Sequence, residues 1–208
     1  MTEWSLGAFL NPLIVAVRYA LQRAGRLFLC LLLFCCAPVA LAGSESVLRE
    51  FAATLDPSEL FAAADRLGEI EASAPVMPIY KGDEQLGYVY VTSDFVDTNG
   101  YSGKPIDILV GIDMQGVIRS IDLLRHAEPI VLIGIPEARI NATLAKYVGK
   151  DIVAFVTGEN VKHKVDAVSG ATVTVIVMDD TILNSTIMVA RAQGLGGLRP
   201  KKKQLGAK

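Results

Sequence analysis

The fold of this chain is decided by residues 106–124, which read IDILVGIDMQGVIRSIDLL. Ile106 to Ile112 and Val117 to Leu124 both alternate between apolar and other residues, the pattern of a β-strand with one face in the core. Asp113-Met114-Gln115-Gly116 joins them as a tight turn, with glycine where a positive φ is needed. Because so short a connection joins antiparallel neighbours, the stretch predicts a β-hairpin.

Upstream of this hairpin the sequence predicts a third strand and two short helices. Leu86 to Val91 alternates and is rich in tyrosine and valine, so it extends the hairpin into an antiparallel meander. Val47, Leu48, Phe51 and Leu55 recur at helical spacing. Asp56-Pro57-Ser58-Glu59 has the acidic cap, the first-position proline and the third-position glutamate of a helix start.

Downstream, a helix from Pro136 to Lys146, a strand from Val153 to Thr157 and a long apolar helix from Val173 to Ala192 are predicted. The last is long enough to cross a membrane, but Asp179 and Asp180 near its middle disfavour that interpretation. We therefore expect an α+β fold, in which helices pack against an antiparallel sheet in a single domain.

The N-terminal 42 residues have the features of a targeting segment. Arginines precede the apolar run Leu27 to Phe34, and Ala40-Leu41-Ala42 supplies the small residues that a signal peptidase reads. We expect residues 1–42 to be a signal peptide or an N-terminal membrane anchor, residues 43–193 to be the domain, and residues 194–208 to be a basic Gly/Lys-rich tail or a truncated juxtamembrane linker.

Charge and cysteine usage exclude several classes of function. The net charge of -2 and the pI of about 5.7 argue against a nucleic-acid-binding surface. All three cysteines, Cys30, Cys35 and Cys36, lie in the targeting segment. After cleavage the chain would have no disulfide, no thiolate metal site and no Cys-ligated iron–sulfur cluster.

The small-residue stretch from Asp166 to Thr174, DAVSGATVT, leads directly into the long apolar helix. A phosphate ester to a side chain needs a hydroxyl on an exposed turn with small neighbours, and Gly170 and Ala171 supply that clearance. If Thr172 or Thr174 begins the helix, the first-turn N–H groups would face the phosphate. Taken by itself, the stretch favours a plain turn with a helix N-cap, because small residues often precede helices.

Three other polar segments remain open to more than one interpretation. The loop Asn99 to Pro105 presents Tyr101, which could pack against a cofactor ring or be an ordinary loop tyrosine. His126 and Glu128 follow the hairpin, as an acid–base pair or as polar residues at a strand end. His163 lies between two lysines, either as a solvated strand end or as part of a phosphate site.

Four segments together resemble the exported FMN-binding domain of the NosR/NirI family. They are residues 100–106 (GYSGKPI), the hairpin 111–124, residues 126–137 (HAEPIVLIGIPE) and residues 166–174. More distantly, they resemble the covalent-FMN subunits of the Rnf and sodium-pumping NADH:quinone reductase complexes. The resemblance implies that FMN is joined by a phosphodiester to Thr172, that Asp166, Ser169, Gly170 and Ala171 form the sequence recognised by a flavin transferase, and that Thr174 and Tyr101 belong to the same cofactor site.

The resemblance also implies partners and a location. Family members act in nitrous oxide respiration, in electron supply to nitrous oxide reductase and in its expression or maturation. The expected partners are therefore a flavin transferase, nitrous oxide reductase or its maturation factors, and membrane electron-transfer components, with no nucleic acid. The expected location is the periplasmic side, as an exported domain that is either released by cleavage or anchored in the inner membrane.

Two alternatives stay open at this point. A regulatory or assembly module that binds flavin or a partner protein, without turnover, would carry the same motifs. Full-length family members continue into membrane spans and cysteine-rich iron–sulfur motifs that this sequence does not contain, so we expect either a fragment of a longer protein or a separate flavin domain.

Overall fold

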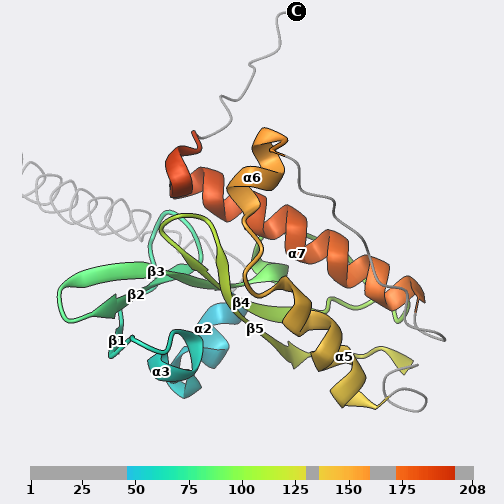
Figure 1. The fold of residues 1–208 in the computed structure, drawn as a ribbon. Helices are drawn as coiled ribbons and strands as arrows, with labels where there is room; N and C mark the ends of the chain where they lie inside the picture. Colours follow the sequence, from blue (N-terminus) through green and yellow to red (C-terminus); the bar gives the residue numbers. More distant parts are fainter. Residues whose placement is uncertain (1–45, 130–135, 160–171, 200–208) are drawn as a thin grey trace, which may run out of the picture. The chain divides into compact units, whose positions relative to one another are not determined.

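A computed structural model of the chain describes residues 46–129, 136–159 and 172–199. Its centre is a five-stranded antiparallel sheet in which the strands follow chain order (Figure 1). The strands are β1 Arg66–Leu67, β2 Val76–Lys81, β3 Glu84–Val91, β4 Asp107–Asp113 and β5 Ile118–Arg125. The helices are α2 Val47–Phe51, α3 Pro57–Leu60, α5 Glu137–Leu144, α6 Ile152–Thr157 and α7 Thr172–Ala192, with 3-10 turns at Ala52–Thr54 (η2), Thr92–Asp94 (η3), Ala145–Tyr147 (η4) and Leu195–Gly197 (η5). The α+β fold class predicted from the sequence is confirmed.

The predicted hairpin is β4 and β5, joined by the turn at Asp113. The Asp113 carboxylate holds this turn, since its Oδ1 accepts from the amides of Gln115 at 2.9 Å and Val117 at 2.8 Å. Gly116 has a φ of +89°, a conformation that costs any residue with a side chain about 1–2 kcal/mol. The turn residues therefore determine where β4 ends and β5 begins.

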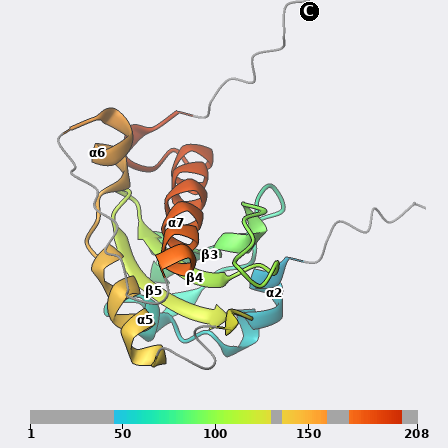
Figure 2. The same cartoon turned by 90° about the vertical axis from the view of Figure 1, so that its right-hand side faces the viewer.

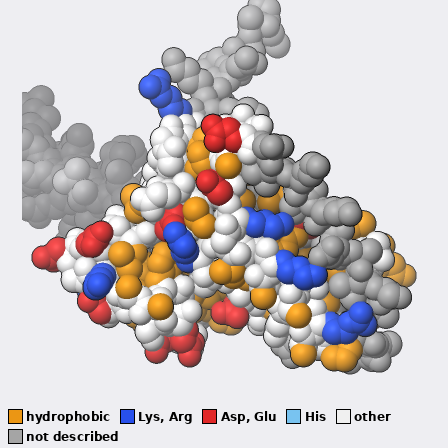
Figure 3. Space-filling model, viewed as in Figure 1, with side chains coloured by type: hydrophobic (Ala, Val, Ile, Leu, Met, Phe, Trp, Pro, Cys, Tyr) orange, Lys and Arg blue, Asp and Glu red, His pale blue; other side chains and the backbone are white. Residues whose placement is uncertain are grey.

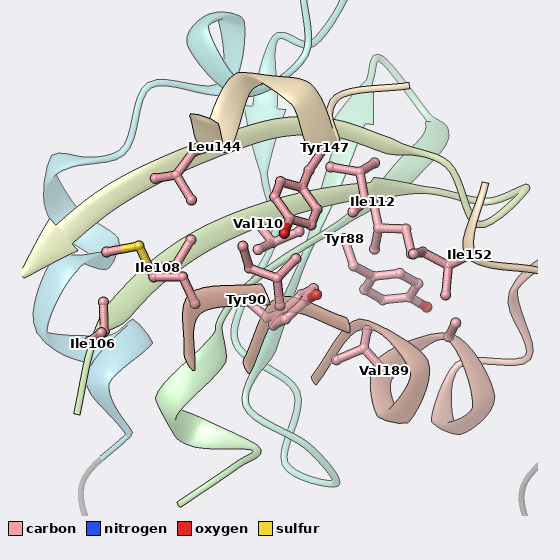
Figure 4. Packing of buried hydrophobic residues seen from close by; sticks show 14 of the residues in the cluster. Tyr88, Tyr90, Ile106, Ile108, Val110, Ile112, Leu144, Tyr147, Ile152 and Val189 are labelled. Carbon is pink, nitrogen blue, oxygen red and sulfur yellow. The ribbon is translucent and has the colours of Figure 1, made fainter. Parts of the chain in front are cut away.

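Both faces of the sheet are covered, so all seven residues of β4 are buried. Ile108, Val110 and Ile112 point to the face covered by α5, α6 and α7, where they meet Tyr88 and Tyr90 of β3 (Figure 4). Leu109 points to the opposite face and joins a second cluster with Leu48 of α2 and Leu60 of α3. The two clusters follow directly from the period of two in a strand.

Helix α7 lies across the first of these faces, with α5 and α6 beside it (Figures 1 and 2). It packs against β4, α6 and η3. Among the described helices, only α7 has the length and hydropathy of a membrane span (mean hydropathy 1.5), yet 61% of that window is buried inside the domain. The prediction of a long helix here is confirmed, and most of its apolar residues pack in the core.

The predicted strand at Val153 to Thr157 is wrong, because these residues form helix α6. The Asp151 side chain caps the helix by accepting from the Ala154 amide at 2.9 Å, and Gly158 ends it in the left-handed conformation with a φ of +79°. A short apolar run has the same periodicity in a strand and in a packed helix. The two flanking residues carried the signal that decides between them.

Residues just beyond Ala192, which the sequence suggests as the beginning of a tail, pack onto the domain. Leu195 is 1% exposed and belongs to the core cluster beneath α7. The Gly196 amide donates to the carbonyl of Met114 in the β4–β5 turn at 3.0 Å. The C-terminal end of α7 therefore lies beside that turn, and the packing of the domain extends to Leu198.

Candidate functional site

The N-terminal end of α7 lies at the edge of the sheet where β5 has ended. Thr172 is the first residue of the helix and is exposed. Asp166, Ser169, Gly170 and Ala171, predicted to precede it as a recognition sequence, lie outside the described residues, as does His163. What the structure describes of the predicted site is Thr172, Thr174 and Tyr101, together with the residues that join them.

Glu128 joins the Tyr101 loop to the first turn of α7. Its Oε2 accepts from the Thr174 hydroxyl at 2.8 Å and from the Tyr101 amide at 3.1 Å, and its Oε1 accepts from the Ser102 amide at 3.1 Å. We refer to Glu128, Tyr101, Ser102 and Thr174 as the Glu128 cluster. It brings together two predicted site residues, Tyr101 and Thr174, that are distant in the chain.

The loop is shaped to surround this carboxylate. The Gly100 amide donates to the carbonyl of Lys104 at 2.9 Å, and the Gly103 amide donates to the carbonyl of Gly100 at 3.0 Å, which closes the loop on itself. A Cβ added at Gly100 would lie 2.1 Å from Oε1 of Glu128. Glycine is required there because the backbone must approach the carboxylate closely.

Glu128 is fully buried, although glutamate is rarely so without partners. Burial by itself raises the pKa of this carboxyl, but hydrogen bonds from the Ser102 amide and hydroxyl, the Thr174 hydroxyl and the Tyr101 amide hold the pKa below its ordinary value. The carboxylate form is therefore stabilised by N–H and O–H donors, and no ion pair to Glu128 occurs within the described ranges.

Apolar side chains are exposed around the same helix end. Of the five large hydrophobic residues that are exposed in the described part of the chain, three are Tyr101 at 78%, Val173 at 57% and Ile176 at 51%. Val173 and Ile176 are three residues apart on α7 and so share one side of the helix with Thr172. An exposed hydroxyl thus lies next to an apolar surface that the domain itself leaves uncovered.

The sequence left open whether His126 and Glu128 form an acid–base pair. The hydrogen bonds of the described residues do not support that interpretation. The carboxylate of Glu128 is occupied by the cluster, and Nδ1 of His126 has no hydrogen-bond partner among the described residues. No group of three or more His, Cys, Asp or Glu side chains that could hold a metal ion occurs among the described residues.

The visible charges are dispersed. On the face that Figure 3 shows, acidic and basic side chains are interspersed with hydrophobic ones, and a short row of basic side chains lies over α5 and the turn that follows it. Elsewhere in the described ranges, Arg125 contacts both Asp107 and Glu50, and Arg119 contacts Asp113.

Sequence reasoning missed the role of Glu128 and of the two exposed residues Val173 and Ile176. A signal for Glu128 was present, since a glutamate directly before the apolar run from Pro129 to Pro136 is costly to bury unless donors surround it. Val173 and Ile176 look like core residues in the sequence, because an apolar helix gives no indication of which side faces the sheet.

Comparison with known proteins identifies the domain. Residues 100–186 match the family model described as an FMN-binding domain. The chain is 41% identical over 156 residues to the regulatory protein NosR of Pseudomonas aeruginosa, and 37% identical over 172 residues to the regulatory protein NosR of Stutzerimonas stutzeri. It is also 39% identical over 128 residues to the protein NirI of Paracoccus denitrificans.

These matches cover 71%, 81% and 61% of this chain, respectively. They cover 22%, 23% and 18% of the relatives, so the chain spans about a fifth of the length of the proteins that it matches. The matched region includes the Tyr101 loop, the hairpin, Glu128 and the beginning of α7. The chain therefore carries an FMN-binding domain of the NosR/NirI family.

Proposed function

We propose that this domain carries FMN covalently on Thr172 and exchanges electrons through it on the periplasmic side of the membrane. The observation that carries the proposal is the position of Thr172: an exposed hydroxyl at the first residue of α7, beside exposed apolar side chains, in a domain of the FMN-binding family. A phosphate on Thr172 would lie near the N–H groups of the first helical turn, which favour an anion.

The residues present fit an FMN group. The ring system of a flavin is flat and largely apolar, and Tyr101, Val173 and Ile176 offer an aromatic and aliphatic surface at the helix end that bears Thr172. When bound, the flavin supplies the redox chemistry, and the protein supplies attachment, orientation and tuning of the potential. Covalent attachment would keep the cofactor from being lost outside the cytoplasm.

Attachment requires a flavin transferase as partner. The Thr172 hydroxyl would attack the flavin phosphate of a flavin dinucleotide, a phosphodiester would form between Oγ1 and that phosphate, and a nucleoside monophosphate would leave. The hydroxyl proton would pass to a base of the transferase, because Glu128 already accepts hydrogen bonds from Tyr101, Ser102 and Thr174.

The relatives' names place this function in context. Two of them are regulatory proteins by name, and the resemblance to the NosR/NirI family supports a role for this chain in nitrous oxide respiration. We propose export by the N-terminal segment, electron supply to nitrous oxide reductase or its maturation factors, and a donor among membrane electron-transfer components.

Intact mass measurement tests the attachment. The full chain is co-expressed with a flavin transferase, and we expect a mass increase equal to one FMN phosphodiester. Thr172→Ser should retain the adduct and Thr172→Val should abolish it. Thr143→Val, at a partly exposed threonine of α5, serves as the control and should be modified normally. An adduct that survives Thr172→Val would refute the assignment.

The same relatives favour a second candidate, a regulatory or assembly module without electron transfer, since "regulatory protein" is the printed description of both NosR proteins. Redox titration of the flavinylated chain separates the two. A carrier shows reversible flavin reduction and exchanges electrons with a partner, whereas a module of the second kind binds flavin or protein without that exchange.

A further inference from the structure

We propose that Glu128 is the positioning residue for Thr172, holding the beginning of α7 and the Tyr101 loop in the arrangement that flavin attachment needs. This inference rests on the proposed function, because it concerns the same hydroxyl. Glu128 itself is buried and would touch neither FMN nor the transferase. Its effect would pass through Thr174 on one side and through the backbone of Tyr101 on the other.

The geometry shows why one side chain has this effect. Thr174 and the Tyr101 amide both donate to the same atom, Oε2 of Glu128, so the helix and the loop are linked through one oxygen. Thr172 is two residues before Thr174 in the same helical turn. A shift of the carboxylate would therefore move Thr172 relative to the Tyr101 ring, and small displacements of a reacting group reduce rates strongly.

The chemistry of the cluster calls for a carboxylate. All three partners are donors, and an ionised carboxylate is purely an acceptor with room for several hydrogen bonds. A glutamine has the same shape but carries an N–H₂ group in place of one oxygen. In one orientation this group faces the Ser102 amide, and in the other it faces the Tyr101 amide and the Thr174 hydroxyl, so donors meet donors in both. The carboxylate has little room to move, because the backbone of Gly100 approaches it so closely that an added Cβ would lie 2.1 Å from Oε1.

The chain contains a matched control at Asp94. Its carboxylate also accepts from two backbone amides and one hydroxyl: Val47 at 2.7 Å, Leu48 at 2.9 Å and the Ser46 hydroxyl at 2.7 Å. This second cluster holds α2, which packs on the opposite face of the sheet from α7. Asp94 lies in η3, which packs against α7, but its carboxylate accepts from residues 46–48, so Asp94→Asn removes the same kind of interaction outside the Glu128 cluster.

The test compares the rate of flavin attachment in the full chain with purified flavin transferase and flavin dinucleotide, followed by intact mass. We expect Glu128→Gln to slow attachment at least tenfold, and Asp94→Asn to react at the wild-type rate. Circular dichroism in the flavin absorption bands, measured on the attached fraction, should change in Glu128→Gln and stay unchanged in Asp94→Asn. General destabilisation would affect both variants alike.

Thr174 provides a milder pair of variants if Glu128→Gln does not fold. Thr174→Val removes only the donor to Oε2 and should slow attachment and alter the flavin spectrum, whereas Thr174→Ser keeps a hydroxyl and should restore both. Wild-type rate and spectrum in Glu128→Gln or, failing its folding, in Thr174→Val would overturn the positioning role while leaving FMN on Thr172 intact. A wild-type chain that takes no FMN would overturn the proposed function and this inference together.

Discussion

Gly100 and Glu128 are the two residues on which the local geometry of the site depends most. The Glu128 carboxylate is enclosed by two backbone amides and a hydroxyl. Gly100, which has no side chain, leaves the space that the carboxylate occupies. Neither residue is exposed to a ligand, yet both determine where Tyr101 stands. We therefore expect the position of the Tyr101 loop to change when a single atom is added at Gly100 or exchanged at Glu128.

Gly100→Ala is expected to destabilise the domain by about 1–3 kcal/mol, the usual cost of forcing a methyl group into filled space. The added Cβ would lie 2.6 Å from Cδ of Glu128, so the loop or the carboxylate must move. Urea unfolding measures the loss. Gly149→Ala is the comparison, because its Cβ meets nothing within 4 Å and its cost comes only from a positive φ of +86°. Normal flavin attachment in Gly100→Ala would contradict the close fit described here.

The lowered pKa of Glu128 predicts that the free energy of unfolding depends on pH. Because its pKa in the folded chain is below the ordinary value of 4.5, the unfolded chain binds more protons in this range, and stability falls as pH falls. The contribution of Glu128 should be complete above pH 4.5 and should be lost as the pH drops through the folded-state pKa.

The measurement is the difference in free energy of unfolding between wild type and Glu128→Gln from neutral to acidic pH. We expect the difference to be largest near neutrality and to shrink below the ordinary pKa of a glutamate. A difference that stays constant with pH would mean that the carboxylate charge contributes nothing.

At the scale of elements, α6 depends on its two ends more than on its apolar residues. Only Ile152 of this helix is fully buried, whereas Asp151 caps its first turn and Gly158 ends it. The helix packs against α7 and so supports the helical layer on that face of the sheet.

Asp151→Ala is expected to reduce the free energy of unfolding by about 0.5–2 kcal/mol, the range for loss of a helix N-cap. Thermal or urea unfolding monitors the change, and Asp151→Ser should recover most of it because serine is also a good cap. An equal loss in the serine variant would show that the cap hydrogen bond to Ala154 is not the cause.

At the scale of the whole molecule, β4 is the strand about which both layers are built. Its residues alternate between the core under α7 and the core above α2 and α3, and every one of them is buried. The site at the beginning of α7 depends on this packing, because α7 is held against β4 along its length.

Ile108→Ala is therefore expected to cost about 2–5 kcal/mol, as large-to-small changes in a filled core do. Ile108 is fully buried, and its removal leaves a cavity between the sheet and α7. Met188 of α7 is 48% exposed, so Met188→Ala should change the free energy of unfolding by less than about 0.5 kcal/mol. Urea unfolding of both variants checks the contrast, and similar losses would contradict the assignment of faces.

The sequence by itself determined the elements that local chemistry specifies. The β4–β5 hairpin followed from alternation and from Asp113 to Gly116, and the length of α7 followed from an apolar run too long for a strand. Thr172 was named through the resemblance of residues 166–174 to the attachment sequence of the family, and the structure describes it as exposed at the first position of the helix. These features depend on neighbours in the chain, so the sequence contains their causes.

Only the tertiary structure decided which residues meet. Residues 153–157 are compatible with strand or helix, and their caps and packing against α7 select the helix. Glu128 is 26 residues from Ser102 and 46 from Thr174, and nothing in its own neighbourhood shows that it will be surrounded by their donors. The apolar side chains Val173 and Ile176 became a candidate surface only when the sheet covered the other side of α7. The reason is physical: burial and hydrogen-bond partners at long range are properties of the packed chain, while turns, caps and periodicity are properties of short segments.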